Sequence, residues 1–189
     1  MDRSPSRAAA FLARAVARQQ TLDDAAIEQL FRDCAHDLHA YAISLLRDRA
    51  AAEDVTALAF ERLYRARARL DPDRGSPRTW LFTIARNAAL DELRRRGRTP
   101  QALVEPDPID DASTAALEDV ERRATLREAL ASLELREREL ILLKFHGQLS
   151  NAELGRTLGI SESNAGTRLH RALARLRERS QTLDRQEVA

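Results

Sequence analysis

The chain has 189 residues, of which 43% are hydrophobic and 32% charged, and its formal net charge at pH 7 is +1. These values suit one medium globular domain or two small ones, and they exclude a uniform polycation, so any nucleic-acid binding has to come from local basic patches. Cys34 is the lone cysteine, which excludes an internal disulfide. No apolar run is long enough to span a membrane, and residues 1–20 lack the apolar core of a secretory signal. We therefore expect a cytoplasmic protein without membrane insertion.

The residue types favour helices. Alanine, leucine and arginine are abundant, aromatic residues make up only 4% of the chain, and no segment alternates in the manner of a strand. The predicted fold class is all-α. Lys144 is the single lysine, so nearly every basic residue is an arginine, which suits phosphate groups and base edges. The base composition of the genome explains the same bias equally well.

Two helices are predicted after a lead-in at residues 1–22. The first carries apolar residues at helical spacing: Leu38, Tyr41, Ala42, Leu45 and Leu46. The second is expected within 49–70 and has the same rhythm at Val55, Leu58, Ala59 and Leu63. Residues 71–78 contain two prolines and a glycine and are expected to break the helical pattern.

A third predicted helix ends in three consecutive arginines, Arg94 to Arg96, and Gly97 and Pro100 are expected to stop it. Its apolar face consists of Leu81, Ile84, Ala85 and Ala88. In one interpretation this basic helix holds backbone phosphates while Trp80 and Phe82 stack on unpaired bases. In the other, both rings belong to the core and the arginines are a solvated helix end favoured by the helix dipole. The residues alone leave both open.

The middle of the chain has the composition of a linker. Residues 99–121 carry prolines and acidic side chains but no basic residue, which indicates a tether followed by the acidic start of a helix. We therefore expect two small helical domains joined by an acidic linker. The expected boundaries are 1–22 for the lead-in, 23–97 for the first domain, 98–114 for the linker, 115–180 for the second domain and 181–189 for the tail.

The second domain is predicted to contain a helix-turn-helix. Ser150 and Glu153 have the spacing of a capping box, Gly159 supplies a tight turn, and Ser161 is placed to cap the helix that follows. The segment before the motif has helical apolar spacing at Leu130, Leu133, Leu140, Ile141 and Leu143. The last helix is expected to pack through Ala165, Leu169, Ala172 and Leu176.

The second helix of such a motif lies in the major groove of DNA. Its outward residues here are Ser163, Asn164, Thr167, Arg168 and Arg171. Asparagine can pair with adenine, and arginine with guanine or phosphate. The alternative is an ordinary helical hairpin with a solvated polar face. The capping box, the turn glycine, the small Gly155 and the basic exit together favour DNA binding.

A metal site or an enzyme is not expected. Cys34 and His36 face apart on a helix, and together with His39 they lack partner ligands. Cys34 is expected to be a small buried hydrophobe. A glycine-rich phosphate loop, a paired-acid site and a nucleophile elbow are all missing from the sequence, so no cofactor is predicted.

Three stretches of the chain occur in an order that matches a known family. They are DRAAAEDV…AFERLY, LDPDRGSPRTWLFTIARNAALDELRRR and LELREREL…LSNAELGRTLGISES…TRLHRALARLRE. Over about residues 26–178 the chain resembles the extracytoplasmic-function (ECF) group of bacterial sigma factors. This resemblance implies two helical domains, conventionally regions two and four, and a non-catalytic protein that recruits core RNA polymerase to a promoter and helps to open the DNA.

The resemblance assigns roles to three surfaces. The loop at 73–78 and the third helix look like the segment that reads and melts the minus-ten element, which implicates Arg74, Ser76, Arg78, Trp80, Arg86, Asn87, Asp91, Arg94, Arg95 and Arg96. The helix-turn-helix looks like the reader of the duplex minus-thirty-five element. The helix over 51–65 looks like the docking surface for the polymerase clamp, with charged residues Glu53, Asp54, Glu61 and Arg62. The implied partners are core RNA polymerase, promoter DNA as duplex and as melted strand, and an anti-sigma factor.

The sequence departs from the family pattern at two places. The docking helix has Ala57 and Leu58 where the family usually carries a Gln–Glu pair, so a charge is missing where a protein contact is expected. The recognition helix has Ala165 and Gly166 where the family tends to have a bulkier apolar residue and a basic one. The second change removes one phosphate contact, which predicts a weaker or different promoter preference.

Two other functions remain open at this point. One is a gene-specific helix-turn-helix regulator that binds duplex DNA without serving as a polymerase subunit. Such a regulator needs no melting segment, so the first domain argues against it. The other is a protein-interaction adaptor that has lost DNA binding, and salt-sensitive DNA binding would count against it.

Overall fold

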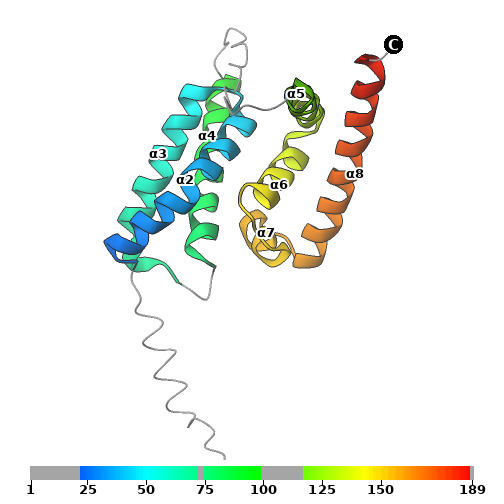
Figure 1. Ribbon diagram of the computed structural model, residues 1–189. Helices are drawn as coiled ribbons and strands as arrows, with labels where there is room; N and C mark the ends of the chain where they lie inside the picture. Colours follow the sequence, from blue (N-terminus) through cyan, green and yellow to red (C-terminus); the bar gives the residue numbers. More distant parts are fainter. Residues whose placement is uncertain (1–21, 72–74, 99–116, 188–189) are drawn as a thin grey trace, which may run out of the picture.

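The fold is built from helices in two groups. The computed structural model describes residues 22–71, 75–98 and 117–187, and within these ranges it contains seven α-helices, one short 3₁₀ helix and no strand. Figure 1 shows the groups side by side, α2 to α4 in one and α5 to α8 in the other. The predicted all-α class with two helical modules is confirmed. Most of the predicted linker lies outside the described residues, as does Arg74.

The first module consists of α2 (Asp24–Leu46), α3 (Arg49–Ala66), the 3₁₀ helix η1 (Arg67–Arg69) and α4 (Pro77–Arg98). Side chains that precede α2 and α3 satisfy free backbone amides at the helix starts: Asp23 accepts from Ala26 N at 2.7 Å, and Asp48 accepts from Ala51 N at 2.9 Å. The predicted apolar face of the first helix is confirmed, because Leu38, Tyr41, Ala42, Leu45 and Leu46 are all buried.

Three predicted helix boundaries were wrong by a few residues. The α-helix expected within 49–70 ends at Ala66, and its last turn tightens into η1. The chain expected to break at 71–78 already becomes helical at Pro77, because proline at the first helical position loses no intrahelical hydrogen bond. Gly97 lies inside α4 rather than beyond it, and no neighbouring side chain packs against that position.

The second module consists of α5 (Leu117–Ser132), α6 (Leu135–Phe145), α7 (Asn151–Leu158) and α8 (Glu162–Glu187). Its predicted apolar residues form a core: Leu133, Leu140, Ile141 and Leu143 are buried, and Leu130 is half-buried. On α8, Ala165, Leu169 and Ala172 are buried and Leu176 packs against them as a partly buried residue. The predicted packing face of the last helix is therefore confirmed.

The turn between α7 and α8 has the predicted chemistry. Ser150 and Glu153 form a complete capping box at the start of α7, and Gly159 ends that helix with a φ of 68°, in the left-handed region. Ser161 Oγ then accepts from Asn164 N at 3.2 Å and caps α8. Gly155 allows the two helices to approach closely, since a Cβ there would lie 2.8 Å from the Ile160 carbonyl oxygen. These contacts fix the angle at which α8 leaves the turn.

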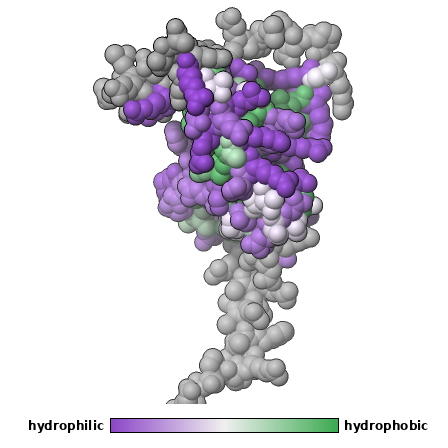
Figure 2. Space-filling model, turned by 90° about the vertical axis from the view of Figure 1, so that its right-hand side faces the viewer, coloured by the Kyte–Doolittle hydropathy of each residue, from purple (hydrophilic) through white to green (hydrophobic). Residues whose placement is uncertain are grey.

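The two modules are packed against each other. Buried apolar side chains from both belong to one continuous cluster, which includes Leu38 of α2 and Leu142 of α6. Helices α6 and α7 lie between the first module and α8 (Figure 1). The opposite side of the second module, over α5 and α8, is mainly hydrophilic (Figure 2). Among the described helices, none combines the length and the apolar character needed to cross a membrane.

The close approach at Gly155 predicts a cost for any side chain. We expect Gly155→Ala to lower the free energy of unfolding by about 1–3 kcal/mol, because the added methyl group meets backbone atoms that cannot rotate away. Chemical denaturation of the full chain measures this loss. Gly97→Ala is the matched control, since that helical position has no atom within 4 Å and should not be destabilised. Equal stability of the Gly155→Ala protein and the parent would contradict the packing described for the turn.

Candidate nucleic-acid interface

Helix α4 buries one of its faces, and the residues of that face show whether Phe82 can stack on a base. Leu81, Phe82 and Ala85 are completely buried. The Phe82 ring meets the Tyr41 ring edge to face, with 5.7 Å between the centroids. Phe82 is therefore a core residue and is not available to stack on a base. Trp80 is only partly buried and packs against the same core, and its indole nitrogen is buried with no hydrogen-bond partner among the described residues.

The arginines at the end of α4 differ from one another. Arg94 pairs with Asp91 at 2.6 Å, and Arg95 pairs with Glu92 at 2.8 Å; the side chains of both arginines are more than half exposed. Arg96 is only 18% exposed and reaches Asp48, the residue that caps α3, at 2.8 Å. Arg94 and Arg95 can therefore meet a polyanion, whereas Arg96 joins α4 to α3.

The acidic partners of these arginines are held in the charged form. Hydrogen bonds from Arg95 and Arg96 lower the pKa of Glu92 to about 2. A backbone hydrogen bond from Ala51, together with the nearby Arg96, lowers the pKa of Asp48. Both carboxylates are ionised at neutral pH, so the end of α4 is a charge network rather than an isolated basic run.

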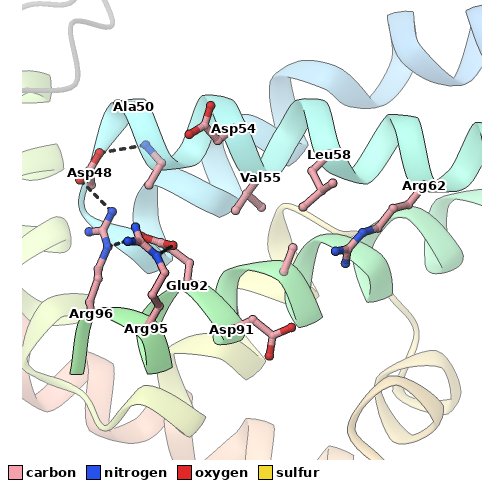
Figure 3. A pocket seen from close by; sticks show the side chains of 12 residues that line it. Asp48, Ala50, Asp54, Val55, Leu58, Arg62, Asp91, Glu92, Arg95 and Arg96 are labelled. Atoms are coloured by element: carbon pink, nitrogen blue, oxygen red, sulfur yellow. Dashed lines mark hydrogen bonds and ion pairs between the residues drawn. The ribbon is translucent and has the colours of Figure 1, made fainter. Parts of the chain in front are cut away.

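A groove of about 450 Å³ lies between α3 and α4 (Figure 3). Val55 and Leu58 point into it from α3, so its centre is apolar. Asp54 and Arg62 stand on its rim, and within the described part of the chain neither has an ion pair. The positions 54, 58 and 62 follow at intervals of four, which places them on one stripe of the helix.

The other two charged residues that were predicted for docking lie on a neighbouring stripe of α3. Glu53 pairs with Arg49 at 3.2 Å, and Glu61 pairs with Arg65 at 2.6 Å, in both cases along the same exposed helix face. Exposed pairs of this kind are weak and exchange readily with other partners. All four predicted residues are at the surface, but only Asp54 and Arg62 border the groove.

The outward face of α8 is exposed over its first turns. Ser163, Asn164, Thr167, Arg168 and Arg171 are all solvent-exposed, opposite the stripe of Ala165, Leu169 and Ala172 that is buried. Arg168 Nε donates to Asn164 Oδ1 at 2.9 Å, so these two side chains are oriented together. The start of α8 therefore presents a polar face on which Asn164 and Arg168 are oriented together.

Two predicted DNA-binding arginines do not face solvent. Arg78 donates to Asp37 Oδ2 at 2.5 Å and to the carbonyl oxygens of His146 and Gly147 at 2.7 and 2.8 Å. Arg86 Nε lies 2.6 Å from Glu139 Oε1 on α6. Ser76 is near the same boundary, 3.3 Å from Glu153. Asn87 and Asp91, in contrast, are exposed.

Comparison with known proteins decides the family. A model of Sigma-70 region 2 matches residues 30–99, and a model of Sigma-70 region 4 matches residues 123–176. The ECF RNA polymerase sigma factor SigL of Mycobacterium tuberculosis is 32% identical over 164 residues, which cover 81% of this chain and 90% of that protein. The chain belongs to the ECF sigma factor family. CarQ, an RNA polymerase sigma factor of Myxococcus xanthus, is 35% identical over 155 residues, covering 81% and 88% of the two chains.

Solved structures of sigma factors have the same fold. The sigma factor RpoE of Bartonella quintana, in complex with the anti-sigma factor NepR, aligns with a TM-score of 0.69 and 26% identity over 80% of this chain and 94% of that one. CnrH, in complex with the cytosolic domain of CnrY, aligns with a TM-score of 0.62 and 26% identity over 93% and 96% of the chains. Region 2 of this sigma factor is the α2–α4 module, and region 4 is the α5–α8 module.

Several contact residues of this sigma factor were not predicted from the sequence. Asp37, Glu139, Glu153 and Thr157 bind side chains of α4, although Glu153 had been identified only as a capping residue. Each partner is separated from its contact by tens of residues, so no local pattern indicates the pairing. The single usable signal was Glu139 itself, an acid on a face of α6 that is otherwise apolar.

No metal site was predicted, and the described residues contain no group of three or more ligating side chains that could hold an ion. Cys34 is buried, as expected for a small hydrophobe, and burial raises the pKa of its thiol. It accepts a hydrogen bond from Arg78 at 3.2 Å. His170, on α8, is exposed.

The unequal roles of the terminal arginines can be measured. We expect Arg96→Ala to lower the free energy of unfolding by about 2 kcal/mol, because it leaves the largely buried Asp48 without its ion-pair partner and Glu92 with Arg95 alone. Arg94→Ala is the matched control and should cost less than about 1 kcal/mol, since its ion pair is exposed. Denaturant unfolding of both variants gives the comparison. Similar losses in the two proteins would show that Arg96 is a surface residue like its neighbour.

Proposed function

We propose that the two modules of this ECF sigma factor bind the two promoter elements and that α3 docks the protein on core RNA polymerase. The observation that carries this proposal is the presence, on one chain and in the family's order, of a region 2 module and a region 4 helix-turn-helix. A regulator that only binds duplex DNA has no use for the first module. The role is non-catalytic, and it is exercised where core polymerase works, in the cytoplasm.

For the minus-thirty-five element, the proposed reader is the start of α8. Asn164 and Arg168 are held together by a hydrogen bond and stand at the exposed N-terminal turns. Arg171 follows one turn later and has no ion-pair partner among the described residues, which leaves its charge for a phosphate or a guanine. Gly166 has no side chain that could reach a phosphate. We therefore propose that this protein makes one contact fewer to the DNA backbone than is common in the family.

For the minus-ten element, the proposed surface is α4 with the loop before it. Trp80 is partly exposed, and Asn87 is exposed on the same helix. Arg94 and Arg95 supply positive charge at the helix end. Stacking on an aromatic ring and attraction to a cationic helix are the two interactions that hold an unpaired strand. Asp91 orients Arg94 rather than binding DNA directly.

For core polymerase, the proposed contact is the groove between α3 and α4. The family's Gln–Glu position is occupied by Ala57 and Leu58, and Leu58 reaches into the groove. We propose an apolar contact at Leu58 that is flanked by ionic contacts at Asp54 and Arg62. Burying one leucine-sized apolar side chain contributes about 1.5–3 kcal/mol, enough to replace the missing polar pair.

We also propose an anti-sigma factor as a partner. The aligned RpoE and CnrH structures are both complexes, one with the anti-sigma factor NepR and the other with the cytosolic domain of CnrY. Their alignments cover most of this chain, including both modules. A protein that binds the two modules at once would keep the DNA surfaces of both from the promoter.

Transcription with purified components tests the proposed function. We expect run-off transcripts from genomic promoter fragments to appear only when this protein is added to core RNA polymerase. Their shared upstream sequences would identify the two promoter elements. Tight duplex binding by the protein alone, without any transcript, would instead favour the stand-alone regulator.

The role of α8 predicts a particular salt dependence. We expect Arg171→Ala to weaken holoenzyme binding to a minus-thirty-five duplex about tenfold and to reduce the slope of log affinity against log salt by about one. Arg179→Ala, an exposed arginine two turns further along α8, should change neither value. Titrations of a labelled duplex at several salt concentrations provide both numbers. An unchanged slope would remove Arg171 from the DNA surface.

A further inference from the structure

A second concave site is lined by residues of α4, α6, α7 and α8, away from the groove between α3 and α4. Its volume is about 450 Å³, which lies within the range of small-molecule pockets in proteins. Five arginines and two glutamates line it, so arginine charges outnumber carboxylate charges by three. The pocket is therefore suited to an anion.

The arginines of the pocket come mainly from two helices that are packed against each other. On α8, Arg168, Arg171 and Arg175 follow at intervals of three and four residues, so they share one face of the helix. On α6, Arg136 and Leu140 are four residues apart and share a face in the same way. All five residues line the pocket, so these two helix faces meet across it. The second module alone supplies four of the five arginines.

Both glutamates of the pocket are already paired with an arginine. Glu139 lies 2.6 Å from Arg86, and Glu137 forms an ion pair with Arg175. The guanidinium charge beside each carboxylate offsets the repulsion that an isolated carboxylate would exert on an incoming anion.

The other three arginines of the pocket, Arg136, Arg168 and Arg171, have no ion-pair partner among the described residues, and all three are exposed. We call them the arginine triad. Arg168 is oriented by the side-chain amide of Asn164, a neutral group that leaves the guanidinium charge uncompensated. Each guanidinium offers a planar fork of N–H donors, and pairs of phosphate oxygens accept such forks.

Part of the pocket wall is apolar. Leu140 is buried, and Leu158 at the end of α7 is partly buried, and both line the pocket. An apolar wall beside the guanidinium groups lowers the local dielectric constant, which strengthens their attraction for an anion relative to a flat, fully hydrated surface. The arginine triad is therefore a better anion site than three isolated surface arginines.

We propose that this pocket binds a polyphosphate anion, either inorganic polyphosphate or the phosphate chain of a nucleotide. A single phosphate group carries a charge of about −1.5 to −2 at pH 7, less than the three positive charges of the triad, so a chain of phosphates matches the pocket better. Arg168 and Arg171 also belong to the surface proposed for the minus-thirty-five element. A bound polyphosphate therefore competes with the duplex, and this part of the inference rests on the proposed function of α8.

Binding of tripolyphosphate to the full-length chain tests the pocket. We expect calorimetric titration at about 0.15 M salt to show one site per chain. Arg136→Ala should weaken binding at least tenfold, and Arg136→Lys should recover only part of the loss, because lysine keeps the charge but lacks the planar fork. Arg179→Ala is the matched control, since it removes an exposed arginine of α8 that does not line the pocket and should leave the affinity unchanged.

Two results would overturn the pocket. One is the absence of tripolyphosphate binding at this salt concentration, and the other is an equal loss for Arg136→Ala and Arg179→Ala, which would mean attraction by diffuse charge alone. ATP without magnesium distinguishes the two sources of polyphosphate, and either result supports the pocket. Equal affinities for ATP and tripolyphosphate would assign recognition to the phosphates, whereas tighter binding of ATP would show that the nucleoside also contacts the pocket.

Competition with the duplex separates this inference from the proposed function. Without tripolyphosphate, Arg136→Ala holoenzyme should bind a minus-thirty-five duplex as the parent does. We expect tripolyphosphate to weaken duplex binding by the parent at least fivefold more than by Arg136→Ala, with sulfate at the same ionic strength as the control for screening. Equal weakening in both proteins would refute competition through the pocket. If Arg171→Ala loses tripolyphosphate binding but keeps the duplex affinity, the proposed role of α8 fails while the pocket stands.

Discussion

The contact of Arg78 with the end of α6 fixes how the two modules of this sigma factor sit on each other. One guanidinium satisfies a carboxylate of α2 and two backbone carbonyls of the second module, which no neutral side chain could do at once. The apolar cluster that runs through both modules attracts them without fixing their orientation. The hydrogen bonds of Arg78 and the Arg86–Glu139 ion pair fix the orientation of one module relative to the other. Helix α4, for which we propose promoter binding, is therefore also part of the inter-module boundary, together with α2.

Helix α4 serves three neighbours because its three faces have different chemistry. The face with Leu81, Phe82 and Ala85 is apolar and belongs to the core. The face with Thr79, Thr83 and Arg86 carries hydroxyl and guanidinium donors. The third face forms one wall of the groove that Leu58 enters from α3.

Much of the fold could be predicted from short-range patterns, since the apolar residues on the buried face of a helix recur at intervals of three and four residues. The apolar face of α2, the capping box at Ser150 and the left-handed turn at Gly159 were all predicted correctly for that reason. The exposed face of α8 follows from the same periodicity. The pairing of Arg86 with Glu139 could not be predicted, because 53 residues separate the two and either one alone looks like a solvated charge. The sequence left two interpretations of Phe82 open, because an aromatic residue in a basic helix fits a core and a stacking platform equally well.

The distance between the modules is the most direct measure of whether the contacts of Arg78 and Arg86 hold the two modules together. Spin labels at Arg65→Cys on α3 and Arg177→Cys on α8, both exposed positions, report that distance by double electron–electron resonance in a Cys34→Ala background. We expect one short, narrow distance distribution for the free chain and a clearly longer one for the holoenzyme bound to promoter DNA. A broad distribution for the free chain would mean that the contacts of Arg78 and Arg86 do not hold the modules together.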